Sequence, residues 1–129
     1  MKSTPIILCV EDNQRNRTLV KRILEYEGYE VQEAESAHQA LEILKSMTPD
    51  LILMDINMPE VDGFMLTHQL RKQPKLSNTP IIAITANAMK GDRERTLQAG
   101  CDSYIEKPIE VDLLIAQVNS YLDHEETND

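Results

Sequence analysis

The sequence predicts an α/β fold in which five helices cover the two faces of one doubly wound, five-stranded parallel sheet. Short apolar runs alternate along the chain with segments of helical periodicity, a pattern typical of this fold class. Four runs end abruptly at a charged or hydroxyl residue, and they are 6–10, 51–54, 81–84 and 104–106. Continuous apolar runs indicate strands buried on both faces of a parallel sheet, and ligands bind beyond the carboxyl ends of such strands. The 129 residues fit one domain, whose core needs neither a disulfide nor a structural metal.

The first run and the segment after it predict a strand, a helix and a second strand. After the strand at 6–10, Asp12 or Asn13 is expected to cap a helix that ends at Gly28. The apolar stripe of this helix comprises Leu19, Val20, Ile23 and Leu24. Residues 30–34 follow as a less apolar strand, which suits the edge of the sheet.

A second helix is predicted from Ser36, a capping residue that has Gln39 three positions later. Apolar residues then recur at helical spacing, at Ala37, Ala40, Leu41, Leu44 and Met47. The helix closes at Thr48, because a residue that precedes a proline, here Pro49, tends to leave helical geometry. The third strand, at 51–54, is the clearest apolar run in the chain.

Three more helices are predicted in the second half of the chain. A loop at 57–63 leads to a helix at 64–72 that stops near Pro74. A fourth helix, from about Ala88 to Ala99, is expected to be thinly anchored, because its apolar stripe consists chiefly of Met89 and Leu97. The last helix has a stronger stripe, made of Val111, Leu114, Ile115, Val118 and Leu122.

The composition is acidic, with 22 Asp and Glu against 13 Lys and Arg and a formal charge of −9. This charge argues against direct binding to nucleic acid or to an anionic membrane, and it indicates proteins or small cations as partners. No apolar segment approaches the roughly 20 residues of a membrane span, and Cys9 and Cys101 lack metal-type spacing, which predicts buried, reduced thiols. We therefore expect a cytoplasmic monomer with one domain at 1–122 and an acidic tail at 123–129.

Three acids lie at the ends of predicted strands: Glu11 and Asp12 after the first, and Asp55 after the third. If these strands are neighbours, the carboxylates lie within several ångströms of one another. Two unit charges about 4 Å apart repel by about 4 kcal/mol at an effective dielectric constant near 20, so the trio holds either protons or a cation. Mg²⁺ suits such a site because it keeps several waters and takes one or two carboxylates, whereas an all-protein Ca²⁺ cage needs roughly six to eight oxygens.

Two other strand ends add a cation and a hydroxyl to the same rim. Lys107 would place an ammonium opposite the acids, where it can pair with a phosphoryl group or with a carboxylate. Thr85 would add a hydroxyl donor. A carboxylate nucleophile, Mg²⁺, an ammonium and a hydroxyl are the parts of a site that forms and stabilises an aspartyl phosphate. Asp55 is the least ambiguous of these residues, because a single acid that ends a buried strand needs a partner or a function.

With these residues the chain resembles the CheY-like receiver domains of two-component response regulators over essentially its whole length. It looks closest to single-domain DivK-like regulators and to the receivers of hybrid kinases. The matching segments are 7–13, 51–59 with Asp62 and Gly63, 84–86 and 104–108. The resemblance implies a flavodoxin-like sheet with strand order 2-1-3-4-5. It also implies a single-domain response regulator of a phosphorelay, which catalyses only its own phosphotransfer and autodephosphorylation and signals by protein–protein interaction.

The resemblance further implies a role for each acid. Asp55 would accept a phosphoryl group from the phosphohistidine of a histidine kinase or a histidine phosphotransfer protein. Mg²⁺ would bind Asp12 and Asp55 directly, Glu11 through a water molecule, and Asn57 through its backbone carbonyl.

The remaining site residues are implied to respond to phosphorylation. Lys107 would pair with the phosphoryl group, and Thr85 would move inward to hydrogen-bond it. Tyr104 would be the aromatic switch that turns in behind Thr85, and the peptide bond between Lys107 and Pro108 would be cis. The thinly anchored fourth helix lies beside this path, so a change in its population would alter a surface that a downstream protein reads.

Other functions fit the residues less well. A haloacid-dehalogenase-type phosphatase needs a second Asp two residues after its nucleophile, where this chain has Asn57. A flavodoxin-like cofactor domain needs a phosphate loop rich in Gly, Ser and Thr, whereas the charges of Glu11 and Asp12 would repel a phosphate. An EF-hand needs Gly where Glu60 stands. A phosphorylation-independent adaptor with the same fold stays open as the alternative.

Overall fold

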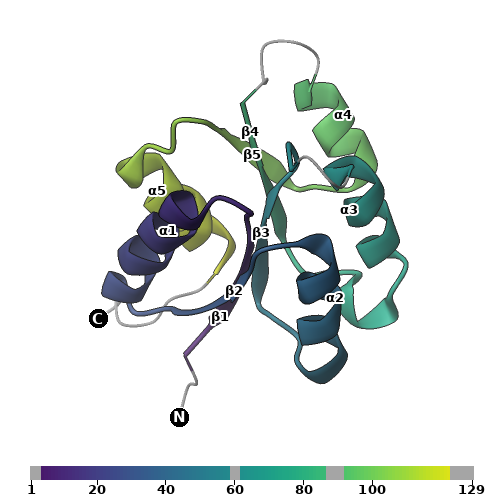
Figure 1. The fold of residues 1–129 in the computed structure, drawn as a ribbon, viewed down its shortest axis with the longest axis horizontal. Helices are drawn as coiled ribbons and strands as arrows, with labels where there is room; N and C mark the ends of the chain where they lie inside the picture. Colours follow the sequence, from purple (N-terminus) through teal and green to yellow (C-terminus); the bar gives the residue numbers. More distant parts are fainter. Residues whose placement is uncertain (1–3, 59–61, 87–91, 123–129) are drawn as a thin grey trace.

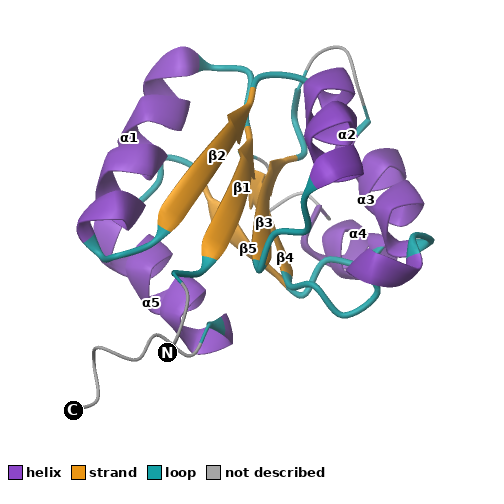
Figure 2. Ribbon diagram, turned by 90° about the horizontal axis from the view of Figure 1, so that it is seen from below, coloured by secondary structure: helices purple, strands orange, loops and turns teal. Residues whose placement is uncertain are grey.

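The computed structural model describes residues 4–58, 62–86 and 92–122 and has the predicted doubly wound α/β fold (Figure 1). Its elements are β1 (Ile6–Val10), α1 (Gln14–Tyr26), β2 (Glu30–Ala34), α2 (Ala37–Ser46), β3 (Leu51–Asp55), α3 (Gly63–Arg71), the short 3₁₀ helix η1 (Pro74–Leu76), β4 (Ile81–Thr85), α4 (Asp92–Ala99), β5 (Ser103–Glu106) and α5 (Val111–Tyr121). Neighbouring strands are parallel, and their order is β2-β1-β3-β4-β5, as the resemblance implies. Helices α1 and α5 cover one face of the sheet, and α2, α3 and α4 cover the other (Figure 2). None of the helices in these ranges is long and apolar enough to cross a membrane.

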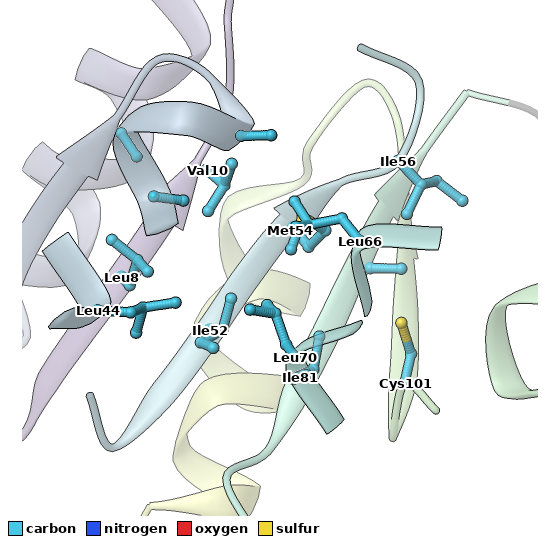
Figure 3. Packing of buried hydrophobic residues seen from close by; sticks show 14 of the residues in the cluster. Leu8, Val10, Leu44, Ile52, Met54, Ile56, Leu66, Leu70, Ile81 and Cys101 are labelled. Atoms are coloured by element: carbon cyan, nitrogen blue, oxygen red, sulfur yellow. The ribbon is translucent and has the colours of Figure 1, made fainter. Parts of the chain in front are cut away.

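Two hydrophobic cores lie on the two faces of the sheet. Side chains alternate along a strand, so Leu8 of β1 points into the core beneath α2 and α3, and its neighbour Ile7 points into the core beneath α1 and α5. Figure 3 shows the first core, in which Leu44 of α2 and Leu70 of α3 pack with Leu8 and Ile52. Every residue of β3 and β4 is buried, which agrees with their continuous apolar runs and central positions.

Both cysteines are free and buried, as predicted. Burial is the main cause that raises the pKa of Cys9 to about 12 and that of Cys101 to about 11. Both thiols are therefore protonated at neutral pH and are poor nucleophiles.

Polar side chains begin the first two helices where the sequence predicts caps. Asn13 caps α1 by accepting the backbone N–H of Asn16 at 3.0 Å, and Ser36 Oγ caps α2 by accepting that of Gln39 at 3.0 Å. The side chain of Gln39 accepts the backbone N–H of Glu35 rather than that of Ser36. The reciprocal contact therefore reaches one residue further back than a capping box requires.

Most helix boundaries agree with the predictions, and a few differ. Gly28 follows α1 with φ of 97°, the left-handed conformation that favours glycine. Helix α3 begins at Gly63 rather than at Phe64, and the 3₁₀ turn that starts at Pro74 was not predicted. Three predicted features lie outside the described residues, and they are the start of the fourth helix at Ala88, Met89, and the acidic tail 123–129.

Three apolar residues that the helical patterns place on buried stripes are exposed instead, and they are Leu19 (41%), Leu97 (47%) and Val111 (44%). Helix α1 buries Val20 and Leu24, which lie one turn apart, so its buried stripe is narrower than the pattern predicts. In α4 the fully buried side chain is Thr96, adjacent to Leu97 in sequence. Its Oγ1 has no hydrogen-bond partner among the residues that the structure describes. The side chain that α4 buries completely is therefore that of a hydroxyl residue, and little apolar burial anchors the helix.

Replacing Gly63 by alanine is expected to lower the free energy of unfolding by about 1 to 3 kcal/mol. A Cβ at this buried position would lie 2.5 Å from the Cα of Ile56, and backbone cannot give way as a flexible side chain can. Urea unfolding followed by circular dichroism measures the loss. Because alanine is otherwise the better helix former by about 1 kcal/mol, an unchanged or increased stability would show that the loop after β3 moves aside freely.

Candidate functional site

Three neighbouring carboxylates meet at the carboxyl ends of β1 and β3. One side-chain oxygen from each of Glu11, Asp12 and Asp55 lies within 4.8 Å of the others. The register pairs Val10 with Met54, so the residues that follow them, Glu11 and Asp55, lie side by side. Glu11 and Asp55 are each only 1% exposed, whereas Asp12 is exposed. The strand order therefore brings together the acids that the sequence predicts.

The two carboxylate oxygens of Glu11 differ in their surroundings. Oε2 accepts the backbone N–H of Asn13 at 3.1 Å. Oε1 is buried without a hydrogen-bond partner among the described residues, and it lies 3.6 Å from Nζ of Lys107. Burial, followed by the influence of Asp55, raises the pKa of Glu11 to about 7, although the N–H of Asn13 and the charge of Lys107 oppose the rise. Without a cation, Glu11 is therefore only partly ionised near neutral pH.

Two hydrogen bonds hold the carboxylate of Asp55. Oδ1 accepts the backbone N–H of Asn57 at 2.9 Å, and Oδ2 accepts from Nζ of Lys107 at 3.1 Å. Burial acts to lower the pKa of Lys107, but the carboxylates of Asp55 and Glu11 together outweigh it, so the pKa of Lys107 lies above its ordinary value. Lys107 is therefore a cation that partly compensates two buried acids.

Lys107 reaches the acids from the end of β5. Its backbone N–H donates to the carbonyl of Thr85 at 2.8 Å, which continues the pairing between β4 and β5 beyond the last strand residue. The peptide bond from Lys107 to Pro108 is cis, the geometry that the resemblance implies. The ammonium of Lys107 contacts Asp55, and because the lysine side chain is 23% exposed, solvent reaches it as well.

The residues predicted to act as a switch lie on the two adjacent strands β4 and β5. Thr85 is fully buried at the end of β4, and Tyr104 on β5 is partly buried against the core beneath α2 and α3. The guanidinium carbon of Arg93 in α4 lies 5.8 Å from the centre of the Tyr104 ring. The side chain of Asn57 accepts the backbone N–H of Ala86 at 2.8 Å, which joins the loop after β3 to the loop after β4.

Several contributors to this site have no clear signal in the sequence. The backbone N–H groups of Asn13 and Ala86 contact site side chains, and a backbone donor has no signature in residue type. Arg17 was also missed, although its guanidinium donates to the carbonyls of Glu11 and Asp12. The one available signal was its position four residues after the cap Asn13, which places it on the first turn of α1 beside the loop.

The donor set fits a hard divalent cation. All three side chains offer carboxylate oxygens, which are the ligands that Mg²⁺ and Ca²⁺ prefer. The buried Oε1 of Glu11, which lacks a hydrogen-bond partner within the described ranges, is an acceptor that a cation or its water would satisfy. A trio of this size suits an ion that keeps part of its water shell, as Mg²⁺ does.

Replacing Glu11 by glutamine is expected to stabilise the metal-free protein above pH 7 by about 1 to 3 kcal/mol. The pKa of Glu11 is about 7 in the folded protein, whereas its ordinary value is 4.5, so the folded state binds this proton more tightly. The corresponding stability is fully present below about pH 4.5 and is lost as the pH rises through about 7. Urea unfolding in EDTA at pH 5 and pH 8 measures this loss as a difference between wild type and variant.

The control for this prediction is Glu25→Gln, which removes an exposed acid from α1. That variant is expected to follow wild type at both pH values. Saturating Mg²⁺ is expected to reduce the advantage of Glu11→Gln at pH 8, because a bound cation removes the penalty of the charged carboxylate. Parallel pH profiles of wild type and Glu11→Gln in EDTA would contradict the prediction.

Comparisons with proteins of known sequence agree with this geometry. Residues 7–119 match the response regulator receiver domain family. The polar-differentiation response regulators DivK of Brucella ovis and Brucella melitensis are each 45% identical over 119 residues, which cover 92% of this chain and 97% of DivK.

Solved structures extend the comparison to three dimensions. The receiver domain of sensor histidine kinase PA1611 from Pseudomonas aeruginosa has a magnesium ion coordinated in its active site cleft. It is 37% identical to this chain with a TM-score of 0.85, over 95% of this chain and 100% of that one. The chemotaxis response regulator CheY4 of Vibrio cholerae is 27% identical with a TM-score of 0.87, over 93% of this chain and 100% of that one. Sequence, fold and strand order therefore agree, and the chain belongs to the response regulator receiver domain family.

Proposed function

We propose that this protein is a response regulator of a two-component phosphorelay in which Asp55 accepts a phosphoryl group in a Mg²⁺-dependent reaction. The observation that supports this proposal most strongly is the environment of Asp55. Its carboxylate is 1% exposed, lies beside two other carboxylates, and has the ammonium of Lys107 at 3.1 Å. A buried ion pair gains little stability over apolar residues of the same volume, so such groups are typical of sites that perform chemistry.

Asp12 and Asp55 would bind Mg²⁺ directly, Glu11 would bind it through a water molecule, and Asn57 would bind it through its backbone carbonyl. When bound, Mg²⁺ would offset the repulsion among the carboxylates and neutralise charge on the oxygens of an incoming phosphoryl group. Asp12 is the exposed member of the trio. We place the approach of the phosphodonor on its side of the site.

The proposed transfer forms one bond and breaks another. A carboxylate oxygen of Asp55 attacks the phosphorus of a phosphohistidine on a histidine kinase or a histidine phosphotransfer protein. As the P–O bond forms, the P–N bond breaks and the imidazole nitrogen keeps the electron pair. Lys107 then pairs with a phosphoryl oxygen in place of the free carboxylate. Attack of water on the phosphorus later releases inorganic phosphate and returns the Asp55 carboxylate.

The response to phosphorylation would pass through Thr85, Tyr104 and α4 to a downstream protein. Thr85 would hydrogen-bond the phosphoryl group, and Tyr104 would turn into the space behind it. Helix α4 buries Thr96 rather than an apolar stripe, so contacts worth a few kcal/mol are enough to shift its population. In this proposal residues 1–122 form the receiver domain and residues 123–129 an acidic tail.

Mass spectrometry of the protein after incubation with acetyl phosphate and Mg²⁺ tests the phosphoacceptor. Wild type is expected to gain one phosphoryl group, and Asp55→Asn is expected to gain none. Asp112→Asn is the matched control, because it makes the same chemical change at an exposed site in the first turn of α5. An unmodified wild type would refute the assignment and favour a phosphorylation-independent adaptor. An adduct that survives in Asp55→Asn would show that another residue accepts the phosphoryl group.

Hydrogen exchange with beryllofluoride and Mg²⁺ tests the switch separately. Beryllofluoride mimics a phosphoryl group on the aspartate, and we expect amide exchange to change across residues 92–99 of α4. Asp55→Asn serves as the control that cannot form the complex. Unchanged exchange in α4, together with a normal phosphoryl adduct, would reject the switch and leave the phosphoacceptor in place.

A further inference from the structure

Arg17, on the first turn of α1, contacts the backbone of the two acids that follow β1. Its Nη1 donates to the carbonyl oxygen of Glu11 at 3.0 Å and to that of Asp12 at 3.4 Å. Its Nε donates to Oε1 of Glu33 on β2 at 3.3 Å. The side chain of Arg17 is only 12% exposed, so its guanidinium is held between this loop and β2.

The partners of Arg17 fix the direction in which its guanidinium points. Nζ of Lys21, one turn later in α1, lies 3.3 Å from the other carboxylate oxygen of Glu33. Glu33 is therefore bound on both sides, by Arg17 and by Lys21. A guanidinium is planar and its donors point in fixed directions, so anchoring Nε on Glu33 sets the direction of Nη1.

We propose that Arg17 is a positioning residue for the metal site: it fixes the backbone of Glu11 and Asp12 so that their carboxylates converge on Asp55. The inference rests on the proposed function, because it assigns Arg17 a role in binding Mg²⁺. The carbonyl groups of the two acids accept from Arg17, and one carboxylate oxygen of each lies within 4.8 Å of the other and of one from Asp55, so the guanidinium fixes the backbone from which these carboxylates extend. Loss of such supporting contacts typically weakens metal binding by about 10- to 100-fold.

A purely electrostatic role for Arg17 predicts the opposite result. Its positive charge lies beside a cation site, so removing that charge alone would strengthen Mg²⁺ binding. Positioning predicts that Arg17→Ala weakens Mg²⁺ binding. Arg17→Lys separates the two roles again, because lysine keeps the charge but cannot contact Glu33 and both carbonyls with one planar group.

The test is a Mg²⁺ titration of the full chain, followed by the backbone amide NMR signals near Asp55. We expect Arg17→Ala to weaken Mg²⁺ binding by about tenfold or more and Arg17→Lys by at least about threefold. Arg22→Ala is the matched control, since it removes the same charge from an exposed position of the same helix, and it is expected to change the affinity less than about twofold. In metal-free samples the amide signals of Asp12 and Asn13 are expected to move in both Arg17 variants and to stay in place in Arg22→Ala.

The possible outcomes separate this inference from the proposed function. If wild type binds Mg²⁺ near Asp55 and Arg17→Ala binds it equally or more tightly, the positioning role is overturned and the proposed function stands. If wild type shows no Mg²⁺-dependent shifts near Asp55, the metal site fails and the role of Arg17 fails with it. Should Arg17→Ala not fold, Arg17→Lys decides the question, because a purely electrostatic role leaves its Mg²⁺ affinity unchanged.

Discussion

Replacement of Arg71 by alanine is expected to lower the free energy of unfolding by about 3 kcal/mol or more, which corresponds to a fall of roughly 10 °C in the melting temperature. Arg71 ends α3, and its guanidinium joins three segments at the end of the sheet away from the acids. It donates to the carbonyl oxygens of Gly100 at 2.9 Å, Leu76 at 2.8 Å and Thr79 at 2.6 Å. It also pairs with Asp102 at 2.7 Å. Alanine would leave these carbonyl groups without their charged donor.

Thermal unfolding followed by circular dichroism measures the effect of Arg71→Ala. The matched control is Lys72→Ala, which removes a positive charge from the next residue, an exposed position. That control is expected to change the stability by less than about 0.5 kcal/mol. Arg71→Lys is expected to recover only part of the loss, because one ammonium cannot replace three separately directed nitrogens. A stability of Arg71→Ala equal to that of Lys72→Ala would show that water replaces the guanidinium without cost.

Replacement of Lys107 by glutamine is expected to have two opposite effects. Without Mg²⁺ it lowers the free energy of unfolding by about 2 to 3 kcal/mol, because Asp55 and Glu11 lose the ammonium that offsets their buried charges. With Mg²⁺ it strengthens ion binding by about tenfold, because a unit positive charge no longer repels the divalent ion. The pKa of Lys107 is raised in the folded state, so its stabilising contribution is fully present at neutral pH and is lost only above the ordinary lysine range.

Urea unfolding in EDTA and across a Mg²⁺ series measures both effects of Lys107→Gln in one experiment. The matched control is Lys45→Gln, since the Lys45 side chain is 71% exposed and pairs only with Glu42 among its described salt-bridge partners. It is expected to behave as wild type throughout. The decisive quantity is the gain in stability between EDTA and saturating Mg²⁺. A smaller gain in Lys107→Gln than in wild type would show that Lys107 assists the ion instead of competing with it.

The fold and the location of the site could be predicted from the sequence because their signals are local. A strand buried on both faces must be apolar throughout, so the end of the run marks the end of the strand. Asp55 illustrates this, since it follows four apolar residues and lies at the end of β3 in the structure. Parallel strands end at the same edge, and it follows that polar residues at separate strand ends meet.

The rotation of α4 about its own axis could not be predicted, because contacts between elements set it. The guanidinium of Arg95 lies 4.3 Å from the centre of the Phe64 ring in α3, and that of Arg93 lies 5.8 Å from the Tyr104 ring on β5. With these contacts to two different elements, the helix buries Thr96 and leaves Leu97 exposed. Hydropathy favours the reverse arrangement, and contacts with α3 and β5, which the sequence pattern of α4 does not contain, accompany the observed one.

Positions that act through the backbone are hidden from sequence patterns for a related reason. Arg17 contacts two carbonyl groups, which every residue has, so its neighbours in sequence carry no mark of the contact. The same holds for the N–H groups of Asn13 and Ala86 in the site. These contacts depend on the path of the loops after β1 and β4. Residue types at the strand ends predict the chemistry of the site but not the groups that hold it in place.

The buried hydroxyl of Thr96 makes the packed position of α4 locally frustrated. Within the described part of the chain its Oγ1 finds no hydrogen-bond partner, and an unsatisfied buried hydroxyl costs about 1 to 3 kcal/mol. A small outward displacement that admits water to Oγ1 recovers this energy and gives up little apolar contact, so local chemistry opposes the arrangement that the fold imposes. In the proposed switch this cost favours release of α4, so phosphorylation of Asp55 would need to supply only the remaining free energy.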